Sequence, residues 1–147
     1  MTQLILLLLT FFINPTTAIA QQTPTMLNLQ SYQWKNRLLV VSAASENTSE
    51  YQQQMQLFSG QTAEFADRDL LVIELFSNGT SRINGNTIEP EDVSQIKQQF
   101  NIGNEFSVIL VGKDGTAKRR ETTPVKPTAI FQQIDAMPMR QQEMRSQ

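Results

Sequence analysis

The sequence contains no cysteine and no histidine. Without cysteine, the chain can form no disulfide bond, perform no thiol redox chemistry and build no Cys/His zinc site. Without histidine, it also lacks Ser-His-Asp and Cys-His nucleophilic machinery, and any side chain whose unperturbed pKa lies near neutrality. A thiol oxidoreductase is therefore excluded, and most catalytic centres that can be recognised from residue types are excluded with it.

Charged residues are also absent from the first twenty positions. Residues 4–13 are apolar except for Thr10, Pro15 interrupts the run, and Ala18-Ile19-Ala20 follows. An apolar core before an A-x-A site is typical of a secretory signal peptide, and the run is shorter than the roughly 20 apolar residues that span a bilayer. We expect residues 1–20 to be a signal peptide. The protein is then exported, periplasmic or secreted, with no transmembrane segment after cleavage.

The rest of the chain alternates apolar strand patterns with helical ones. The run Leu38–Val41 is apolar at every position, which fits a central strand buried on both faces. Asp114-Gly115 between two strand-like runs predicts a hairpin, and Pro138 breaks the last helical pattern. Strands are predicted at 38–41, 70–76, 106–111 and 116–120, and helices at 49–58, at 90–100 and from 127 onward.

This order, β-α-β-α-β-β-α, predicts an α/β fold. Two βα units, a hairpin and a closing helix match a thioredoxin-like three-layer sandwich with a mixed four-stranded sheet. We expect residues 21–30 to be a mobile segment and residues 31–147 to form one domain with a C-terminal helical tail. The loop after Val41 occupies the place where such folds keep their chemistry, but it contains no recognisable nucleophile.

Four short motifs carry a resemblance to a known family. They are Tyr32–Val41, Arg68-Asp69-Leu70, Val111–Gly115 and Asp135–Met144. With these motifs the chain resembles the domain of unknown function 4174, found in small exported bacterial proteins and in extracellular sushi-repeat-containing proteins of animals. The resemblance implies a thioredoxin-like fold and a link to matrix and cell-surface adhesion, and it carries over no catalytic residues. Thioredoxin-like enzymes have a proline before the third strand, and residues 101–106 contain none.

Basic residues gather at the predicted hairpin and form the first candidate binding surface. Lys113, Lys118, Arg119 and Arg120 can bind phosphate or an acidic polymer. The alternative is an edge strand that uses charge to prevent sheet-to-sheet aggregation. Neither the export signal nor the lack of interleaved aromatic residues favours nucleic acid as the partner.

Two further clusters are candidate sites for a ligand or a partner. Trp34, Lys35 and Arg37 can bind a carboxylate or form a cation–π contact, or Trp34 can simply cover one edge of the core. Met139, Arg140 and Glu143 can form an adaptable partner surface, or a tail in which Arg140 and Glu143 pair at a spacing of three.

These observations favour an exported, non-catalytic binding module whose partner is a protein or an anionic envelope or matrix component. The alternative is a non-redox enzyme, such as a carboxylate-based hydrolase, with an apolar-walled pocket that contains an acid of strongly shifted pKa. No cofactor is predicted. No metal site is predicted either, because the acids near Asp92 do not match the spacing of an EF-hand loop.

Overall fold

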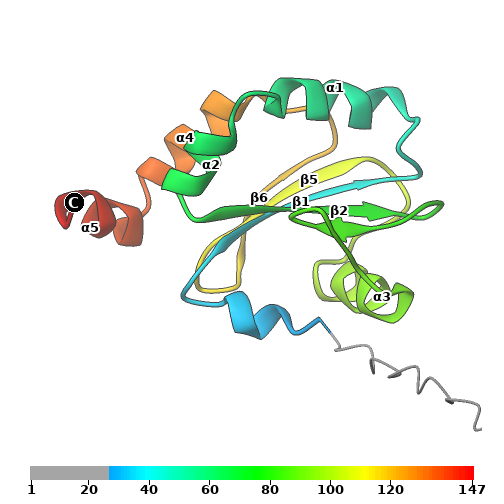
Figure 1. Ribbon diagram of the computed structural model, residues 1–147, viewed down its shortest axis with the longest axis horizontal. Coiled ribbons are helices and arrows are strands. Elements are labelled where there is room, and N and C mark those ends of the chain that lie inside the picture. The colour runs from blue at the N-terminus through cyan, green and yellow to red at the C-terminus, as the bar shows by residue number, and fades with distance from the viewer. Residues whose placement is uncertain (1–26) are drawn as a thin grey trace, which may run out of the picture.

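The computed structural model describes residues 27–147, so the predicted signal peptide and most of the segment 21–30 lie outside the described residues. Figure 1 shows a central sheet with α1, α2 and α4 over one face and α3 over the other. The elements are η1 (Leu29–Tyr32), β1 (Arg37–Ala43), α1 (Ser49–Phe58), α2 (Thr62–Asp67), β2 (Leu70–Phe76), β3 (Arg82–Ile83), β4 (Asn86–Thr87), α3 (Pro90–Gln99), β5 (Ser107–Val111), β6 (Ala117–Glu121), α4 (Pro127–Asp135) and α5 (Pro138–Arg145).

The sheet has the strand order β4-β3-β2-β1-β5-β6. Strand β1 pairs with β2 in parallel and with β5 antiparallel, so the predicted mixed sheet is confirmed. The predicted count of four strands is wrong, because β3 and β4 extend the sheet beyond β2. Each has only two residues, too few to show an alternating pattern. The turn between them contains Asn84 and Gly85, both at positive φ, as a tight hairpin requires.

The core lies on both faces of β1, as its continuous apolar run predicts. Every residue of β1 is buried. Leu39 and Val41 belong to the cluster beneath α1 and α4, whereas Leu38 and Val40 belong to the cluster on the α3 side. Alternation of side chains along a strand places them on opposite faces. Full burial of each such side chain contributes roughly 1.5–3 kcal/mol, so β1 anchors both layers.

Prolines set the start of three helices. Pro90, Pro127 and Pro138 occupy the first turn of α3, α4 and α5, where the missing N–H costs no hydrogen bond. Pro138 also separates α5 from α4, as predicted from the sequence. Figure 1 shows α5 projecting from the end of the sandwich.

The two ends of the sheet are distinct. Parallel pairing sets Arg37 of β1 beside Leu70 of β2, and antiparallel pairing brings Val111 of β5 to the same end. We call this the entry end, because β1 and β2 begin here. We call the opposite end the exit end, where β1 and β2 finish at Ala43 and Phe76.

Candidate functional site

The fold gathers at the entry end all four motifs that carry the family resemblance. Residues 32–41 lead into β1, residues 68–70 lead into β2, and residues 111–115 follow β5. Residues 135–144 join α4 to α5. Within them, Glu143 forms ion pairs with Arg37 of the first segment and Lys113 of the third, and Asp135 pairs with Arg68 of the second. Motifs that are up to about a hundred residues apart in the chain therefore build one site.

Glu143 on α5 is the centre of a set of ion pairs. The carboxylate accepts two hydrogen bonds from Arg37, at 3.1 Å from Nη1 and 3.2 Å from Nη2. Lys113 Nζ lies 2.7 Å from Glu143 Oε1 and also 2.7 Å from Asp69 Oδ2. Arg37 is only 1% exposed. The helix α5 is thus tied to the first residue of β1 and to the loop after β5.

A second set of ion pairs continues from the first. Arg140 donates to Asp67 and to Asp135, the latter at 3.2 Å. Asp135 also accepts from Arg68 at 2.7 Å. The guanidinium of Arg68 lies 4.5 Å from the centre of the Phe131 ring, within the range of a cation–π contact. We call the two sets together the ion-pair network. Its members are Arg37, Glu64, Asp67, Arg68, Asp69, Lys113, Asp135, Arg140 and Glu143.

The carboxylates at the centre of this network stay ionised. Burial by itself would raise the pKa of Glu143, but the hydrogen bonds from Arg37 and Lys113 outweigh it and leave that pKa below its usual value. Burial opposes ionisation of Asp135 in the same way, and hydrogen bonds from Arg68 and Arg140 lower its pKa on balance. Both acids therefore keep their charge at neutral pH, and the pairs persist.

The network holds α5 in place where apolar packing does little. Its two methionines, Met139 and Met144, are 36% and 39% exposed, whereas Arg140 is 3% exposed. An amphipathic helix usually buries its apolar side chains and exposes its charged ones. Helix α5 does the reverse, because it buries Arg140 and leaves its methionines partly exposed. The predicted pair of Arg140 and Glu143 exists only as a 3.8 Å contact, longer than the pairs these residues make with other segments.

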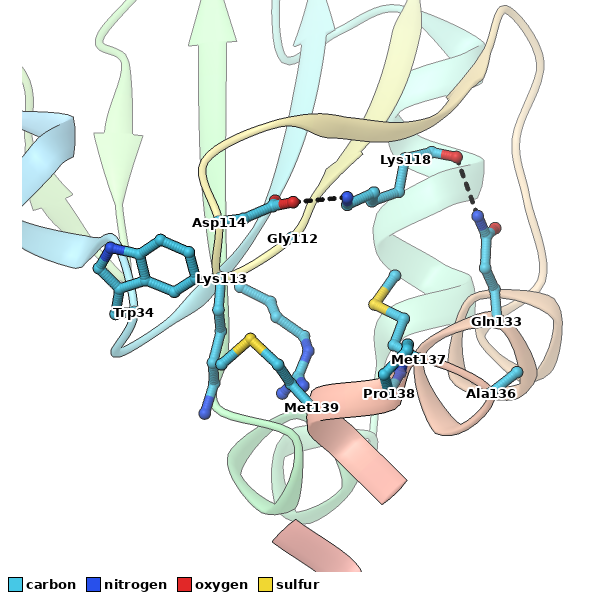
Figure 2. Close-up of a pocket in the computed structure, with 11 residues that line it drawn as sticks. Trp34, Gly112, Lys113, Asp114, Lys118, Gln133, Ala136, Met137, Pro138 and Met139 are labelled. Atoms are coloured by element: carbon cyan, nitrogen blue, oxygen red, sulfur yellow. Dashed lines mark hydrogen bonds and ion pairs between the residues drawn. The ribbon is translucent and has the colours of Figure 1, made fainter. Parts of the chain in front are cut away.

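A cavity of about 580 Å³ lies beside the network. Figure 2 shows Trp34 at one side of it, Gln133 at the other, and Lys113, Met139 and Met137 between them. The walls are largely apolar, and the size is that of a ligand pocket. The lining residues are Trp34, Arg37, Gly112, Lys113, Asp114, Lys118, Gln133, Ala136, Met137, Pro138 and Met139.

Trp34 is held on the cavity rim in an unusual backbone conformation. Its φ is 67°, a left-handed value that costs a bulky residue roughly 1–2 kcal/mol. The turn is fixed by a 2.6 Å hydrogen bond from the Trp34 N–H to the Lys113 carbonyl and by Gln33 Nε2 donating to the Asp114 carbonyl. The side chain is 62% exposed, so the idea that Trp34 covers an edge of the core is wrong.

Lys118 reaches the cavity from an irregular part of β6. Leu110 pairs with Arg119 and Val111 with Ala117, so Lys118 is the extra residue of a bulge, a feature that redirects side chains. Its ammonium lies 2.7 Å from Asp114 Oδ2 (Figure 2). Gly112 makes room for this pair, because a Cβ there would lie 2.7 Å from Lys118 Cε. The hydrogen bond from Lys118 also lowers the pKa of Asp114.

The other predicted site residues lie outside the cavity. Lys35 is exposed on the same turn as Trp34 but does not line the cavity. Arg119 pairs with Glu121 at 2.7 Å and donates to Gln133, while Arg120 donates to the carbonyl of Phe100. The predicted basic cluster of the hairpin is therefore divided among several partners. Arg140 and Glu143 lie behind the cavity, in the ion-pair network.

Sequence reasoning missed several residues of the site. Gln133 and Ala136 line the cavity, and Asp67, Asp69 and Asp135 complete the network. Asp69, Asp135 and Ala136 stand inside the family motifs, which was the available signal. Nothing in the spacing of Gln133 and Asp67 connects them with the rest.

The exit end, where the fold would keep its chemistry, has a different character. The loop after β1 borders a cavity of about 340 Å³ that includes Ala44, Thr48 and Glu50. Nearby, Tyr51 donates to Glu74, and Arg82 lies 3.2 Å from the same carboxylate. Burial, followed by the hydrogen bond with Glu74, raises the pKa of the Tyr51 hydroxyl, so it stays protonated.

Within residues 27–147 no group of three acids is placed to hold a metal ion. Asp92, one of the acids considered for calcium, is buried and accepts a 2.8 Å hydrogen bond from the Leu27 N–H. No helix in the described part of the chain is long and apolar enough to cross a bilayer.

The sequence model of one family, described as a domain of unknown function (DUF4174), matches residues 28–143. The chain belongs to this family. The prediction made from the four motifs is thereby confirmed.

Curated relatives of this DUF4174 chain are much longer proteins. Coiled-coil domain-containing protein 80 of Danio rerio is 35% identical over 136 residues, which cover 81% of this chain and 16% of the relative. The human Sushi repeat-containing protein SRPX is 31% identical over 120 residues, which cover 79% of this chain and 26% of the relative. The chain thus spans about a sixth to a quarter of their length.

Comparison with solved structures identifies the fold class. The reduced 2-Cys peroxiredoxin of Plasmodium vivax superposes with a TM-score of 0.61 at 11% identity, over 79% of this chain and 72% of that one. This likeness confirms the predicted thioredoxin-like α/β class. It extends to the fold alone, because this DUF4174 chain has no cysteine.

Proposed function

We propose that this protein is an exported, non-catalytic thioredoxin-like module that binds a protein or an envelope or matrix polymer in the entry-end cavity. The observation that carries the proposal is the position of Trp34. An indole that is 62% exposed contributes little burial energy to folding, and its left-handed backbone conformation is unfavourable. Such strain persists only where the surroundings enforce it, and it gathers at functional sites.

The ion-pair network supports this role by making the cavity rigid. Met137, Pro138 and Met139 form one wall, and they belong to the segment that Arg140 and Glu143 dock on the sheet. Binding surfaces gain affinity when the free protein is already ordered, because less conformational entropy is lost. Buried charge pairs stabilise a fold poorly but can fix one arrangement, which a preformed site needs.

The chemistry of the cavity supports binding over catalysis. Asp114 is the acid among its lining residues, and its lowered pKa makes it a weak base. A carboxylate-based hydrolase needs an acid whose pKa is raised, together with a second carboxylate. The cavity therefore favours the interaction module.

Export of the protein is supported by the leader-like residues 1–20. The family resemblance to sushi-repeat-containing proteins agrees with a role outside the cytoplasm. An exported position would place Trp34 and the methionines where envelope or matrix components can reach them.

Site-specific cross-linking in the host tests the proposal. A photoreactive benzoyl-phenylalanine would replace Met139, which lines the cavity, or Met144, which has a similar exposure on the same helix but lies outside it. We expect a cross-linked product from position 139 that is weak or absent from position 144. Adding Trp34→Ala should remove the product, since the indole supplies much of the contact.

The control pair makes the outcome decisive. Equal products from positions 139 and 144 would contradict the cavity as the binding site, as would a product that survives Trp34→Ala. No product from either position, in folded protein recovered outside the cytoplasm, would contradict the proposed function.

A further inference from the structure

The unused hydrogen-bonding capacity of the entry-end cavity consists of donors. Arg37 lines the cavity, is 1% exposed, and has no hydrogen-bond partner for its Nε–H among the described residues. Lys118 has three N–H donors and gives one to Asp114. Trp34 adds an exposed indole, whose six-membered ring lies toward the other labelled residues in Figure 2.

The side-chain acceptors of the cavity are already engaged. Asp114 receives hydrogen bonds from Lys118 and from the backbone and hydroxyl of Thr116. Gln133 accepts from Arg119 and donates to the Lys118 carbonyl. A ligand that brings mainly donors, such as a basic peptide, would find few partners here.

The charge of the cavity lining also favours a ligand that brings acceptors, in particular an acidic one. The lining contains the cations Arg37, Lys113 and Lys118 against the single acid Asp114. The acids that balance Arg37 and Lys113 lie behind them, in the ion-pair network. The pair of Lys118 and Asp114 is about a third exposed, and a pair of that kind is worth little, so an incoming carboxylate can share the ammonium.

The remaining lining residues are apolar and favour an apolar group of the ligand. Ala136, Met137, Pro138 and Met139 line the cavity together with the indole of Trp34 (Figure 2). Methionine side chains adapt to the shape of an inserted group, and tryptophan is prominent among the residues that dominate protein interfaces. An anionic polymer without apolar groups would leave this surface unfilled.

We propose that the cavity recognises a segment of a partner protein in which a large apolar side chain stands next to an acidic residue. The apolar side chain fills the space between Trp34 and the methionines, and the carboxylate is held by Lys118 on the rim. This inference rests on the proposed function and narrows its partner to a protein of stated chemistry.

The single tryptophan of the whole chain provides the readout, because Trp34 stands in the cavity. Its fluorescence would be titrated with acetyl-Phe-Glu-amide, with the isosteric acetyl-Phe-Gln-amide and with acetyl-Phe-Lys-amide. Acetyl-Gly-Glu-amide tests the apolar side chain, and laurate tests a lipid as an alternative occupant. We expect the Phe-Glu peptide to bind about three- to tenfold more tightly than the Phe-Gln peptide at low salt, because a charge-assisted hydrogen bond replaces a neutral one.

Two lysine variants make the test specific. Lys118→Ala should abolish the preference for Phe-Glu over Phe-Gln. Lys126→Ala removes the same charge from an exposed position outside the cavity and should leave the preference intact. Circular dichroism would establish that both variants are folded.

Each other outcome overturns the inference. Equal binding of the Phe-Glu and Phe-Gln peptides, tighter binding of Phe-Lys, or no change in fluorescence at about 10 mM of any peptide would contradict it. Tighter binding of laurate would assign the cavity to a lipid. Cross-linking from position 139 without a preference for the acidic peptide would retain the proposed function and refute only this chemistry.

Discussion

At the two ends of the sheet, the polar and charged side chains that bond to one another are separated by very different distances in the sequence. At the entry end, Arg37 and Glu143 pair across a separation of 106 residues, and their neighbours connect β1, β2, β5 and α5. At the exit end, Tyr51 and Glu74 bond across 23 residues, and Arg82 of β3 pairs with the same Glu74 and with Glu46. The entry end thus depends on the assembled fold, whereas the exit end is a local contact between neighbouring elements.

The candidate site therefore lies at the entry end, opposite the end of the sheet where the fold suggests a site. Thioredoxin-like enzymes are expected to keep their chemistry in the loop after the first strand, which in this chain lies at the exit end. The loop contains no cysteine and no histidine, and the larger, more apolar cavity is at the other end. A common fold can carry unrelated sites, and here the helix α5 builds one.

The largest expected effect is that of Arg37→Met. The change leaves the Glu143 carboxylate with fewer cations and removes a hydrogen bond to the Arg68 carbonyl, so we expect the free energy of unfolding to fall by about 3 kcal/mol. Tyr51→Phe at the exit end is the matched change and should cost about 1 kcal/mol. Urea denaturation measures both. Equal losses for the two variants would remove the distinction between the ends.

Acid should weaken the entry end first. The folded-state pKa values of Glu143 and Asp135 lie below their ordinary values, so their contribution to stability is complete above about pH 5 and is lost as the pH falls through the lowered values, below about pH 4. Denaturation midpoints at pH 7 and pH 3 measure the loss. Glu143→Gln should be less stable at pH 7 and lose less on acidification, and an unchanged pH dependence in this variant would refute the assignment.

The smallest expected effect is that of Trp34→Asn on stability. Asparagine tolerates the left-handed backbone better than tryptophan, and little apolar burial is lost, so the free energy of unfolding should change by no more than about 1 kcal/mol. Trp34→Ala keeps the backbone penalty and should be the less stable of the two. A loss above about 2 kcal/mol in Trp34→Asn would make the indole part of the core.

Much of the fold could be predicted from local patterns. The apolar run Leu38–Val41, the prolines at positions 90, 127 and 138, and Asp114-Gly115 each specify their element through short-range sterics and burial. The strands β3 and β4 could not be predicted as part of the sheet, since two-residue strands have no periodicity and depend on β2 beside them.

The candidate site was predicted as three separate clusters, and the structure brings five of their ten residues to one cavity. Trp34, Arg37, Lys113, Lys118 and Met139 line one cavity, whereas Arg119 and Arg120 turn to other partners. Spacing in the sequence suggested that Arg140 pairs with Glu143, but that contact is the long one, at 3.8 Å.

By itself, the sequence determined the absence of thiol and histidine chemistry, the central buried strand and the starts of α1, α3 and α4, because these depend on residue type and near neighbours. Only the tertiary structure decided that Arg37 is buried against Glu143, that Trp34 is exposed, and that a bulge carries Lys118 to the same cavity. These features arise when distant segments pack together, since the energy of a buried charge depends on which partner the fold brings to it.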